Sequence, residues 1–415
     1  MRVLLAAYAA RSHLLPMVPL AQALAAAGHE VRVASQPALA GDIAAGGLTA
    51  VPVGRDHIVR RVLGARPDIA SRLRNAGMPP FDLAQGPPEG VTWEALSAGY
   101  RDFAVPWLFR LVNEPMLADL VEFCRFWRPD LVIWEPITLA APLAAAAVGA
   151  AQVRLLWSAD LFGHLRASFT ELRGTRPVED RADPLAELME RWGARYGVTF
   201  TEELLSGRLT VDQTPPSIRM EPGLPCLSMR YVPYHGPSVL PRWLWRRPER
   251  PRVCVTLGIT DGQLHGRSSL PLDELLSALA GLDADVVTTL PPHDHRKVPA
   301  NVTAVGWVPL RALVSGSSAV IHHAGWGTVC TTAYCGVPQL ALAQREFDGP
   351  LLARSVAAQG AGLVLEPENL DGDRVRDCVR RLLEDPPFRR GAARLREEMR
   401  SMPSPAEVVA ELEGL

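Results

Sequence analysis

The feature that most constrains this chain is an alternation of short apolar runs with helix-like segments, and it occurs twice. In the N-terminal part, apolar runs of the kind that form buried β-strands lie at 3–7, 31–34, 49–53, 131–134 and 152–156. Segments between them, such as 15–27, have the length and apolar content of helices. Short apolar strands that alternate with helices are typical of parallel, doubly wound α/β sheets.

The alternation starts again after a Pro-rich segment that has the composition of an interdomain linker. Beyond it, strand-like runs lie at 253–257, 285–290, 302–305, 319–322 and 339–342. The predicted domains are an N-terminal domain at 1–230, a linker at 231–252, a C-terminal domain at 253–400, and a helix at 401–415 that packs back on the N-terminal domain. Two facing Rossmann-like sheets would bind small molecules between them.

Charge and composition exclude several classes of protein. The 415 residues carry a formal net charge of −2, so no overall positive field attracts nucleic acid or an anionic membrane. Two uncharged stretches, 12–29 and 136–153, are interrupted by prolines, so we predict buried helices and no membrane span. The first residues indicate a strand rather than a signal peptide. The six cysteines form no CxxC pair, which favours free thiols in a reducing cytoplasm.

One stretch, HAGWGT at 323–328, follows a predicted strand and opens a predicted helix. The first turn of a helix has unpaired N–H groups and a partial positive charge. Gly325 and Gly327 let a ligand approach the backbone. His323 and Thr328 add donors, so the turn would form a phosphate site. From these residues alone, a plain strand-to-helix turn with incidental histidines stays the alternative.

Several separated motifs resemble those of family 1 glycosyltransferases. HAGWGT, GVPQ and EFD resemble the region that binds the donor nucleotide, VTLGIT resembles the first loop of the donor domain, and GWVPL resembles the loop that holds the nucleobase. SHLLPMVPLAQALAAAGHEVRVASQPAL resembles the start of the acceptor domain. With LTAVPVGRDH and DLVIWEPITLAAPLAAAA, the chain is similar to the actinobacterial enzymes that attach TDP-deoxysugars to polyketide antibiotics of macrolide or anthracycline type. The resemblance covers nearly the whole chain and implies the GT-B fold.

The resemblance implies an inverting displacement at the anomeric carbon of the sugar, by an acceptor hydroxyl that a general base activates. His13 matches the family's base position, on the loop that we expect between the first strand and the first helix, and histidine titrates near neutral pH. Without the family, a packing or capping histidine is the better interpretation. Glu135 follows a predicted strand, which places it either against the acceptor or sugar or as the cap of a helix that begins at Pro136. The carboxylate that orients the base is not identified.

The resemblance also implies a donor site in the C-terminal domain. The residues assigned to it are Gly258, Thr260, Trp307, Val308, His323, Gly325, Trp326, Gly327 and Thr328. Trp307 and Val308 would bracket the nucleobase, with a core anchor as the alternative for Trp307. Asp348 matches an acidic position that binds sugar hydroxyls. Gly349 replaces the glutamine that is usual beside it, which fits either a deoxygenated sugar or a degraded donor site.

No metal site is predicted. Fixed donors at a helix end would stabilise the leaving diphosphate, so the TDP-sugar co-substrate needs no metal and no further cofactor. The Asp-Ala-Asp triplet at 283–285 is interpreted as turn chemistry, and the His-Asp-His triplet at 293–295 as an exposed loop.

The expected partners are a TDP-deoxysugar and a hydrophobic polyketide aglycone. Residues 55–99 break the α/β rhythm, and in the resembling subgroup this region often docks a cytochrome-P450-like activator protein. A loop that closes over the acceptor is the other interpretation. A homodimer is one open oligomeric state. The sequence specifies neither the aglycone, nor the sugar, nor O- against C-attachment.

Two other functions compete with glycosyl transfer. One is a nucleotide-sugar epimerase of the same fold, against which the N-terminal match argues. The other is a non-catalytic relative that serves as a scaffold. Gly349 is the support for a scaffold, whereas His13 and His323 favour an enzyme.

Overall fold

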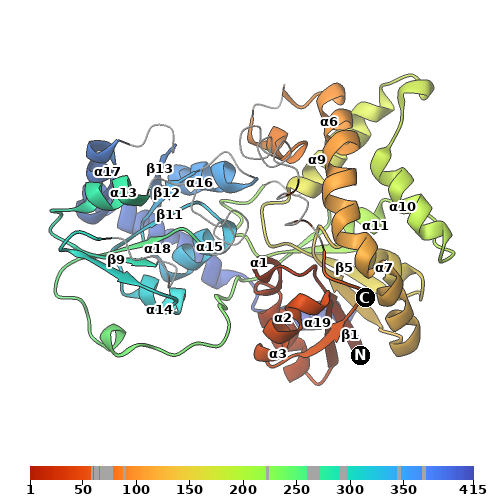
Figure 1. Ribbon diagram of the computed structural model, residues 1–415, viewed down its shortest axis with the longest axis horizontal. Coiled ribbons are helices and arrows are strands. Elements are labelled where there is room, and N and C mark those ends of the chain that lie inside the picture. Colours follow the sequence, from red (N-terminus) through yellow and green to blue (C-terminus); the bar gives the residue numbers. More distant parts are fainter. Residues whose placement is uncertain are drawn as a thin grey trace. The chain divides into compact units, whose positions relative to one another are not determined.

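The computed structural model describes residues 1–57, 59, 65, 78–86, 90–220, 224–258, 272–289, 297–343, 347–366 and 371–415. They form two compact units, each with its own parallel sheet (Figure 1). Unit 1 consists of Met1–Gln213, Met220–Met229 and Pro403–Leu415, and unit 2 of Thr214–Arg219 and Arg230–Met402. The predicted fold class, a parallel α/β sheet in each half, is confirmed.

The sheet of unit 1 has the strand order β3-β2-β1-β4-β5-β6-β7, and every neighbouring pair is parallel. Its strands are β1 (Arg2–Ala6), β2 (Glu30–Ser35), β3 (Thr49–Pro52), β4 (Leu131–Trp134), β5 (Ala151–Leu155), β6 (Leu209–Asp212) and β7 (Cys226–Ser228). All four residues of β4 are buried, as are the last four of β1. Strands at the centre of a parallel sheet are covered on both faces, which is why these two are continuous apolar runs.

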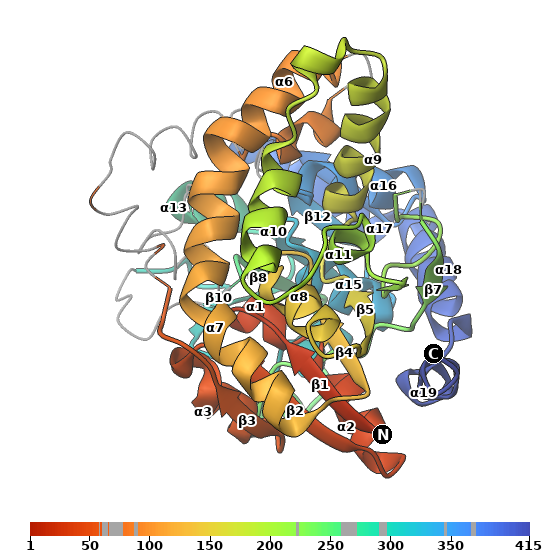
Figure 2. The ribbon, with the colours of Figure 1, turned by 90° about the vertical axis from the view of Figure 1, so that its right-hand side faces the viewer.

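Helices of different lengths surround this sheet. They are α1 (Arg11–Leu14), α2 (Val18–Ala26), α3 (Ala40–Ala45), α6 (Trp93–Gly99), α7 (Arg110–Trp127), α8 (Ala140–Ala146), α9 (Leu161–Gly174), α10 (Pro184–Ala194), α11 (Glu203–Ser206) and α19 (Pro405–Leu412), with short turns η1 (Pro37–Leu39), η2 (Phe81–Gln85) and η5 (Val178–Asp180) and a π-helical segment η4 (Tyr100–Phe109). The long α7 packs against α8 (Figure 2). The C-terminal α19 packs on α2 and so belongs to unit 1.

The first helix differs from the prediction. A single helix was expected at 15–27, with His13 on the loop before it, but the chain already turns into α1 at Arg11. The proline at 16 cannot donate a backbone hydrogen bond and its ring clashes with a preceding turn, so the helix is interrupted there. It restarts as α2, whose first turn accommodates Pro19 because first-turn N–H groups lack helical partners. His13 therefore lies in a short helix.

The sheet of unit 2 has the order β10-β9-β8-β11-β12-β13, again parallel throughout. Its strands are β8 (Arg252–Thr256), β9 (Asp285–Thr289), β10 (Val302–Val305), β11 (Ala319–His322), β12 (Gln339–Leu342) and β13 (Gly362–Leu365). Its helices are α13 (Leu272–Leu279), α14 (Leu310–Ser315), α15 (Trp326–Cys335), α16 (Gly349–Ala358), α17 (Gly372–Glu384) and α18 (Pro386–Ser401), preceded by the short turn η6 (Arg242–Trp245). One core cluster joins the sheet to α13 and α17, and a second joins it to α14.

Three short strands were not predicted, namely β6, β7 and β13. Each has three or four residues and stands at or next to an edge of its sheet. Such strands lack the long apolar run that marks a central strand, so their sequences carry little signal.

Candidate active site

The strand order of each sheet reverses at one place, and predicted site residues gather there. In unit 1 it reverses between β1 and β4, and in unit 2 between β8 and β11. Loops that leave the carboxyl ends of two such strands diverge, which creates a crevice for ligands. His13 and Glu135 follow β1 and β4, while Gly258 and His323 follow β8 and β11. Each unit therefore carries polar residues at its own switch point.

His13 is 4% exposed, and both of its ring nitrogens have polar neighbours. Nδ1 lies 3.0 Å from Oε2 of Glu135, which is fully buried. Nε2 lies 3.2 Å from the hydroxyl of Tyr8. An ionised carboxylate only accepts hydrogen bonds, so Glu135 holds a proton on Nδ1. In the neutral imidazole the lone pair then lies on Nε2.

The carboxylate of Glu135 accepts hydrogen bonds from three further groups. The indole Nε1–H of Trp157 donates at 2.8 Å and the backbone N–H of Ile137 at 3.1 Å, both to Oε2, while the hydroxyl of Thr138 donates to Oε1. Burial raises the pKa of Glu135, but the charge and hydrogen bond of His13 and the hydrogen bonds from Thr138 and Ile137 outweigh it, so the pKa is lowered overall. Glu135 is therefore ionised at neutral pH. No helix begins at Pro136: α8 starts at Ala140 with Leu139 as its N-cap and no capping side chain, so Glu135 holds a turn through Ile137 and does not cap a helix. The carboxylate beside His13 is Glu135.

Two aromatic rings enclose the imidazole of His13. The ring of Trp157 lies 3.8 Å from it between centroids, and that of Tyr8 4.4 Å in an edge-on arrangement. Burial raises the pKa of Tyr8, so its hydroxyl is neutral. Sequence reasoning assigned a role to neither ring. Their positions just after β5 and β1 were the available signal, because carboxyl ends of parallel strands meet at one edge.

In unit 2 the turn between β11 and α15 is tightly built. Ala324 has a φ of 67°, in the left-handed region, and Gly325 is the N-cap of α15 without a capping side chain. The imidazole of His323 lies between Gly258 and Gly325, so close that a Cβ added to either glycine would collide with it. Gly325 was predicted to admit a ligand to the backbone, and Gly258 was assigned to the donor site. In this structure they make room for the ring of His323.

The start of α15 presents backbone donors. The N–H groups of Thr328 and Val329 bond to the carbonyl of Gly325, at 3.0 Å each. The N–H groups of Trp326 and Gly327 lie earlier in the first turn, where helical geometry provides no carbonyl within the helix to accept from them. Together with the helix dipole they favour an anion at this end.

Trp326 itself points elsewhere. Its indole is 4% exposed, donates to the hydroxyl of Thr214 at 2.9 Å, and packs edge-on against Tyr231. Trp326 therefore anchors α15 in the core of unit 2, and its side chain is not presented by the turn.

The other predicted donor residues lie at separate strand ends. Trp307 follows β10 and is 48% exposed, which excludes a core anchor. The side chain of Val308 packs in the core cluster beneath α14, so its backbone is the part that a ligand could contact. Asp348 is 5% exposed and directly precedes α16. Thr260 lies outside the described residues, as does the triplet at 293–295.

The described residues also bear on metal sites and membrane spans. Within the described parts of the chain, no group of three or more His, Cys, Asp or Glu side chains could hold a metal ion. None of the helices described above is both long enough and apolar enough to cross a membrane. Only the last residue of the Asp283–Asp285 triplet belongs to β9, and Asp285 pairs with Arg250 at 2.5 Å.

Comparisons with known proteins agree over the whole chain. Family models described as "Erythromycin biosynthesis protein CIII-like" match it, the N-terminal domain at residues 22–258 and the C-terminal domain at 273–415. The 10-deoxymethynolide desosaminyltransferase of Streptomyces venezuelae is 46% identical, over 100% of this chain and 97% of that protein. The 3-alpha-mycarosylerythronolide B desosaminyl transferase of Saccharopolyspora erythraea is 43% identical, over 100% and 98%. The crystal structure of the glycosyltransferase VinC in complex with dTDP has 40% identity and a TM-score of 0.88, over 100% of this chain and 99% of that one.

Proposed function

The chain belongs to the erythromycin biosynthesis protein CIII-like family and is a glycosyltransferase of the GT-B fold, and from this premise we propose its reaction. It transfers a deoxysugar from a TDP-sugar to a hydroxyl of a polyketide-type aglycone, with inversion at the anomeric carbon. His13 is the general base, and no metal ion takes part. The observation that carries this proposal is the buried pair of His13 and Glu135 at the switch point of unit 1.

The pair suits proton abstraction from an alcohol. Glu135 holds Nδ1–H, so Nε2 carries the lone pair and accepts the proton of the acceptor hydroxyl once that hydroxyl replaces Tyr8 as its partner. The acceptor oxygen then attacks the anomeric carbon while the bond from that carbon to the diphosphate oxygen breaks. The resulting imidazolium is stabilised by the adjacent carboxylate, which the surrounding hydrogen bonds keep ionised. Trp157 holds the carboxylate and flanks the ring, so His13 needs little reorganisation during the step.

Unit 2 would bind the donor. Negative charge develops on the diphosphate as it leaves, and the N-terminal end of α15 offers backbone N–H groups and a positive dipole end. His323 stands directly before this helix end as a further donor. These fixed donors support a metal-independent reaction. The exposed indole of Trp307 is available to stack on a nucleobase.

The relatives support the proposed sugar and acceptor. Two of them are named desosaminyl transferases, and VinC was solved with dTDP. Asp348 would bind a sugar hydroxyl, and Gly349 offers no second side chain, which suits a sugar with few hydroxyls. A P450-like activator is part of the proposal for residues 55–99, of which 58, 60–64, 66–77 and 87–89 lie outside the described residues. A homodimer stays part of the proposal as well.

Calorimetric titration with TDP tests the donor site. We expect micromolar binding that EDTA does not change and that His323→Ala weakens at least about 10-fold, since it removes a donor to a charged group. UDP serves as the competitor. Binding that requires a divalent ion would contradict the metal-independent mechanism, and absence of binding would contradict the donor assignment.

Turnover of TDP-deoxysugars with macrolactone or anthracyclinone acceptors, with and without an activator protein, tests catalysis. Loss of the base should lower kcat by about 10²–10⁴-fold in His13→Ala. The matched control is His164→Ala, because His164 is an exposed histidine of α9 in the same unit. A His13→Ala enzyme with wild-type turnover would refute the base assignment, and a wild-type protein that binds TDP but never turns over would favour a scaffold.

A further inference from the structure

We propose that His322 is a positioning residue that locks the turn 323–325, and thereby holds His323 and the start of α15 ready for the donor diphosphate. This inference rests on the proposed donor site. His322 is the last residue of β11 and is 1% exposed, so it acts on a ligand only through the turn that follows it.

Both ring nitrogens of His322 are hydrogen-bonded inside the protein. The backbone N–H of Ala324 donates to Nδ1 at 3.0 Å, and Nε2 lies 2.7 Å from Oε1 of Gln339 on β12. A backbone N–H is an obligatory donor, so Nδ1 must carry a lone pair. The proton of the neutral ring is then on Nε2, where it is donated to the Gln339 oxygen. The contacts thus specify one tautomer.

The ring must stay neutral for this arrangement to hold. Burial lowers the pKa of His322 to about 4, with a smaller opposing effect of the bond to Gln339 and a lowering effect of His323. The groups that interact with the ring are the N–H of Ala324, the side chain of Gln339 on β12, and the neighbouring His323. At neutral pH Nδ1 is therefore an acceptor and does not repel the N–H of Ala324.

The bond acts on the one strained residue of the turn. Ala324 has a φ of 67°, a left-handed conformation that residues with a Cβ adopt only at a cost in free energy. A side chain that accepts from the N–H two residues later stabilises a chain reversal, as Asn and Asp do in Asx-turns. The reversal places the ring of His323 in the slot between Gly258 and Gly325 and makes Gly325 the N-cap of α15.

Stability alone does not account for these two polar residues. The Nε2 amide group of Gln339 is buried without a hydrogen-bond partner in the described parts of the chain. An unsatisfied buried donor costs free energy that an apolar residue would avoid. Gln339 therefore makes sense as the acceptor that fixes the tautomer of His322.

The test is a pair of polar substitutions that each keep one side of the ring's contacts. In His322→Asn, Oδ1 takes the place of Nδ1 and can accept from Ala324. In His322→Gln, the amide takes the place of Nε2, and the N–H of Ala324 loses its acceptor. We expect TDP affinity, measured by calorimetry on the full-length protein, to fall about 10-fold in His322→Gln and no more than about 3-fold in His322→Asn, as loss and retention of one hydrogen bond predict. The donor KM should rise in parallel, because the same turn binds the diphosphate of the sugar donor.

A second variant separates the lock from a general structural effect. Glycine adopts the left-handed region freely, so Ala324→Gly needs no lock. In that background His322→Gln should weaken TDP binding by no more than about 2-fold, because the competent turn is already well populated. An equal loss in both backgrounds would overturn the proposal, as would wild-type affinity in a folded His322→Gln.

Two observations distinguish failure of this inference from failure of the donor site. If wild-type protein binds TDP and His323→Ala weakens it, but His322→Gln does not, the lock alone is refuted. If wild-type protein does not bind TDP, the donor site itself is refuted. If the variants do not fold, histidine ¹⁵N NMR on the wild type still tests the proposal. A proton on Nε2 of His322 at pH 7 supports the lock, and a proton on Nδ1 overturns it.

Discussion

At the scale of single residues, the charge of Glu135 is the property that the proposed mechanism needs. Glu135→Gln keeps an oxygen for the Nδ1–H of His13 but removes the negative charge that stabilises the imidazolium. Its amide N–H₂ would take the place of Oε1, to which the hydroxyl of Thr138 donates in the wild type. We expect kcat to fall about 10²-fold or more, on the scale of general-base catalysis.

Steady-state kinetics at saturating substrates checks this prediction, with Trp157→Phe as the matched control. Phenylalanine keeps an aromatic ring beside His13 and removes one hydrogen bond to Glu135. It should lower kcat by no more than about 10-fold. Glu135→Gln with half the wild-type turnover or more would show that the carboxylate is dispensable.

A second residue-scale prediction concerns acid stability. The pKa of His322 is lowered to about 4 in the folded protein, against about 6.5 for an unperturbed histidine. Between these pH values the unfolded chain binds more protons than the folded protein. The contribution of His322 to the free energy of unfolding is therefore fully present above about pH 6.5 and is lost as the pH falls towards 4. The loss between pH 7 and pH 5 should be about 2 kcal/mol from this residue. Urea unfolding at both pH values checks it, and the same difference should be smaller in His322→Asn.

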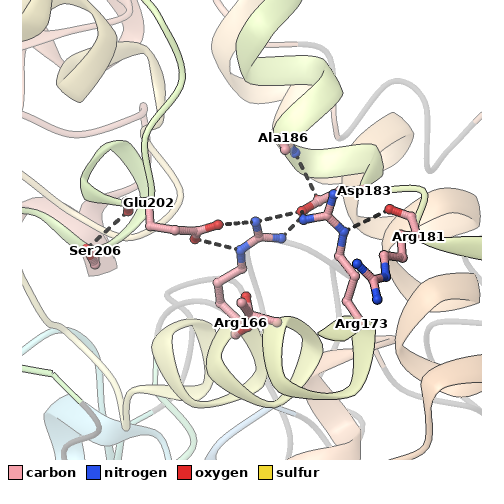
Figure 3. A network of polar contacts seen from close by, with 8 residues as sticks. Arg166, Arg173, Arg181, Asp183, Ala186, Glu202 and Ser206 are labelled. Carbon is pink, nitrogen blue, oxygen red and sulfur yellow. Dashed lines mark hydrogen bonds and ion pairs between the residues drawn. The ribbon is translucent and has the colours of Figure 1, made fainter. Parts of the chain in front are cut away.

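At the scale of elements, the guanidinium of Arg166 on α9 joins two further segments of unit 1 (Figure 3). It donates two hydrogen bonds to Asp183, the N-cap of α10, at 2.9 and 2.7 Å, and two to Glu202 at 2.9 and 2.6 Å. Asp183 in turn accepts from the N–H of Ala186 at 3.0 Å. Burial lowers the pKa of Arg166, but its hydrogen bonds to Glu202 and Asp183 and the charges of these carboxylates outweigh burial, so the pKa is raised overall and Arg166 stays charged.

Removing this arginine should destabilise unit 1. Asp183 is 4% exposed, so Arg166→Leu leaves a buried carboxylate without its main partner, which costs about 3–5 kcal/mol. Glu202→Gln is the control, because half of that side chain is exposed and exposed pairs contribute at most about 1 kcal/mol. Thermal unfolding followed by circular dichroism measures both. Equal melting temperatures for the two variants would contradict the central role of Asp183.

The same scale shows what the sequence could predict. Long apolar runs identified β1, β4 and β11, and motif matches placed His13 and His323 at strand ends, because both signals are local in the chain. The pairing of His13 with Glu135 is not local. It depends on β4 lying next to β1, although β2 and β3 intervene in the chain. Trp326 shows a second limit of sequence-based prediction. A motif match gives the position of a residue but not the direction of its side chain, which here points to Thr214.

At the scale of the whole molecule, both sheets share one design. In each, the chain builds three strands outward from the centre, returns, and builds outward on the other side. The return creates the switch point, so the site residues follow from the winding of the sheet rather than from any one motif. This explains why His13 and Glu135 in unit 1, and Gly258 and His323 in unit 2, occupy equivalent places despite unrelated local sequences.

Both the first and the last residues of the chain belong to unit 1. After α18 of unit 2, α19 packs on α2 of unit 1, with Val408, Val409 and Leu412 all at most 3% exposed. Glu413 pairs with His29 at 3.0 Å, and the N-terminal ammonium lies 3.2 Å from the same imidazole. Each fully buried Val or Leu contributes roughly 1.5–3 kcal/mol, whereas a half-exposed ion pair contributes at most about 1 kcal/mol.

Deleting residues 403–415 should therefore destabilise unit 1 through lost apolar burial. The truncated protein should melt at a lower temperature and be cleaved faster by protease near α2, whose buried face loses its cover. Glu413→Gln should leave the melting temperature within a few degrees, in line with an exposed ion pair. TDP binding, which is proposed for unit 2, should survive the deletion at temperatures where unit 1 is still folded. A deletion that abolishes TDP binding but leaves thermal stability unchanged would assign the segment to the donor site instead.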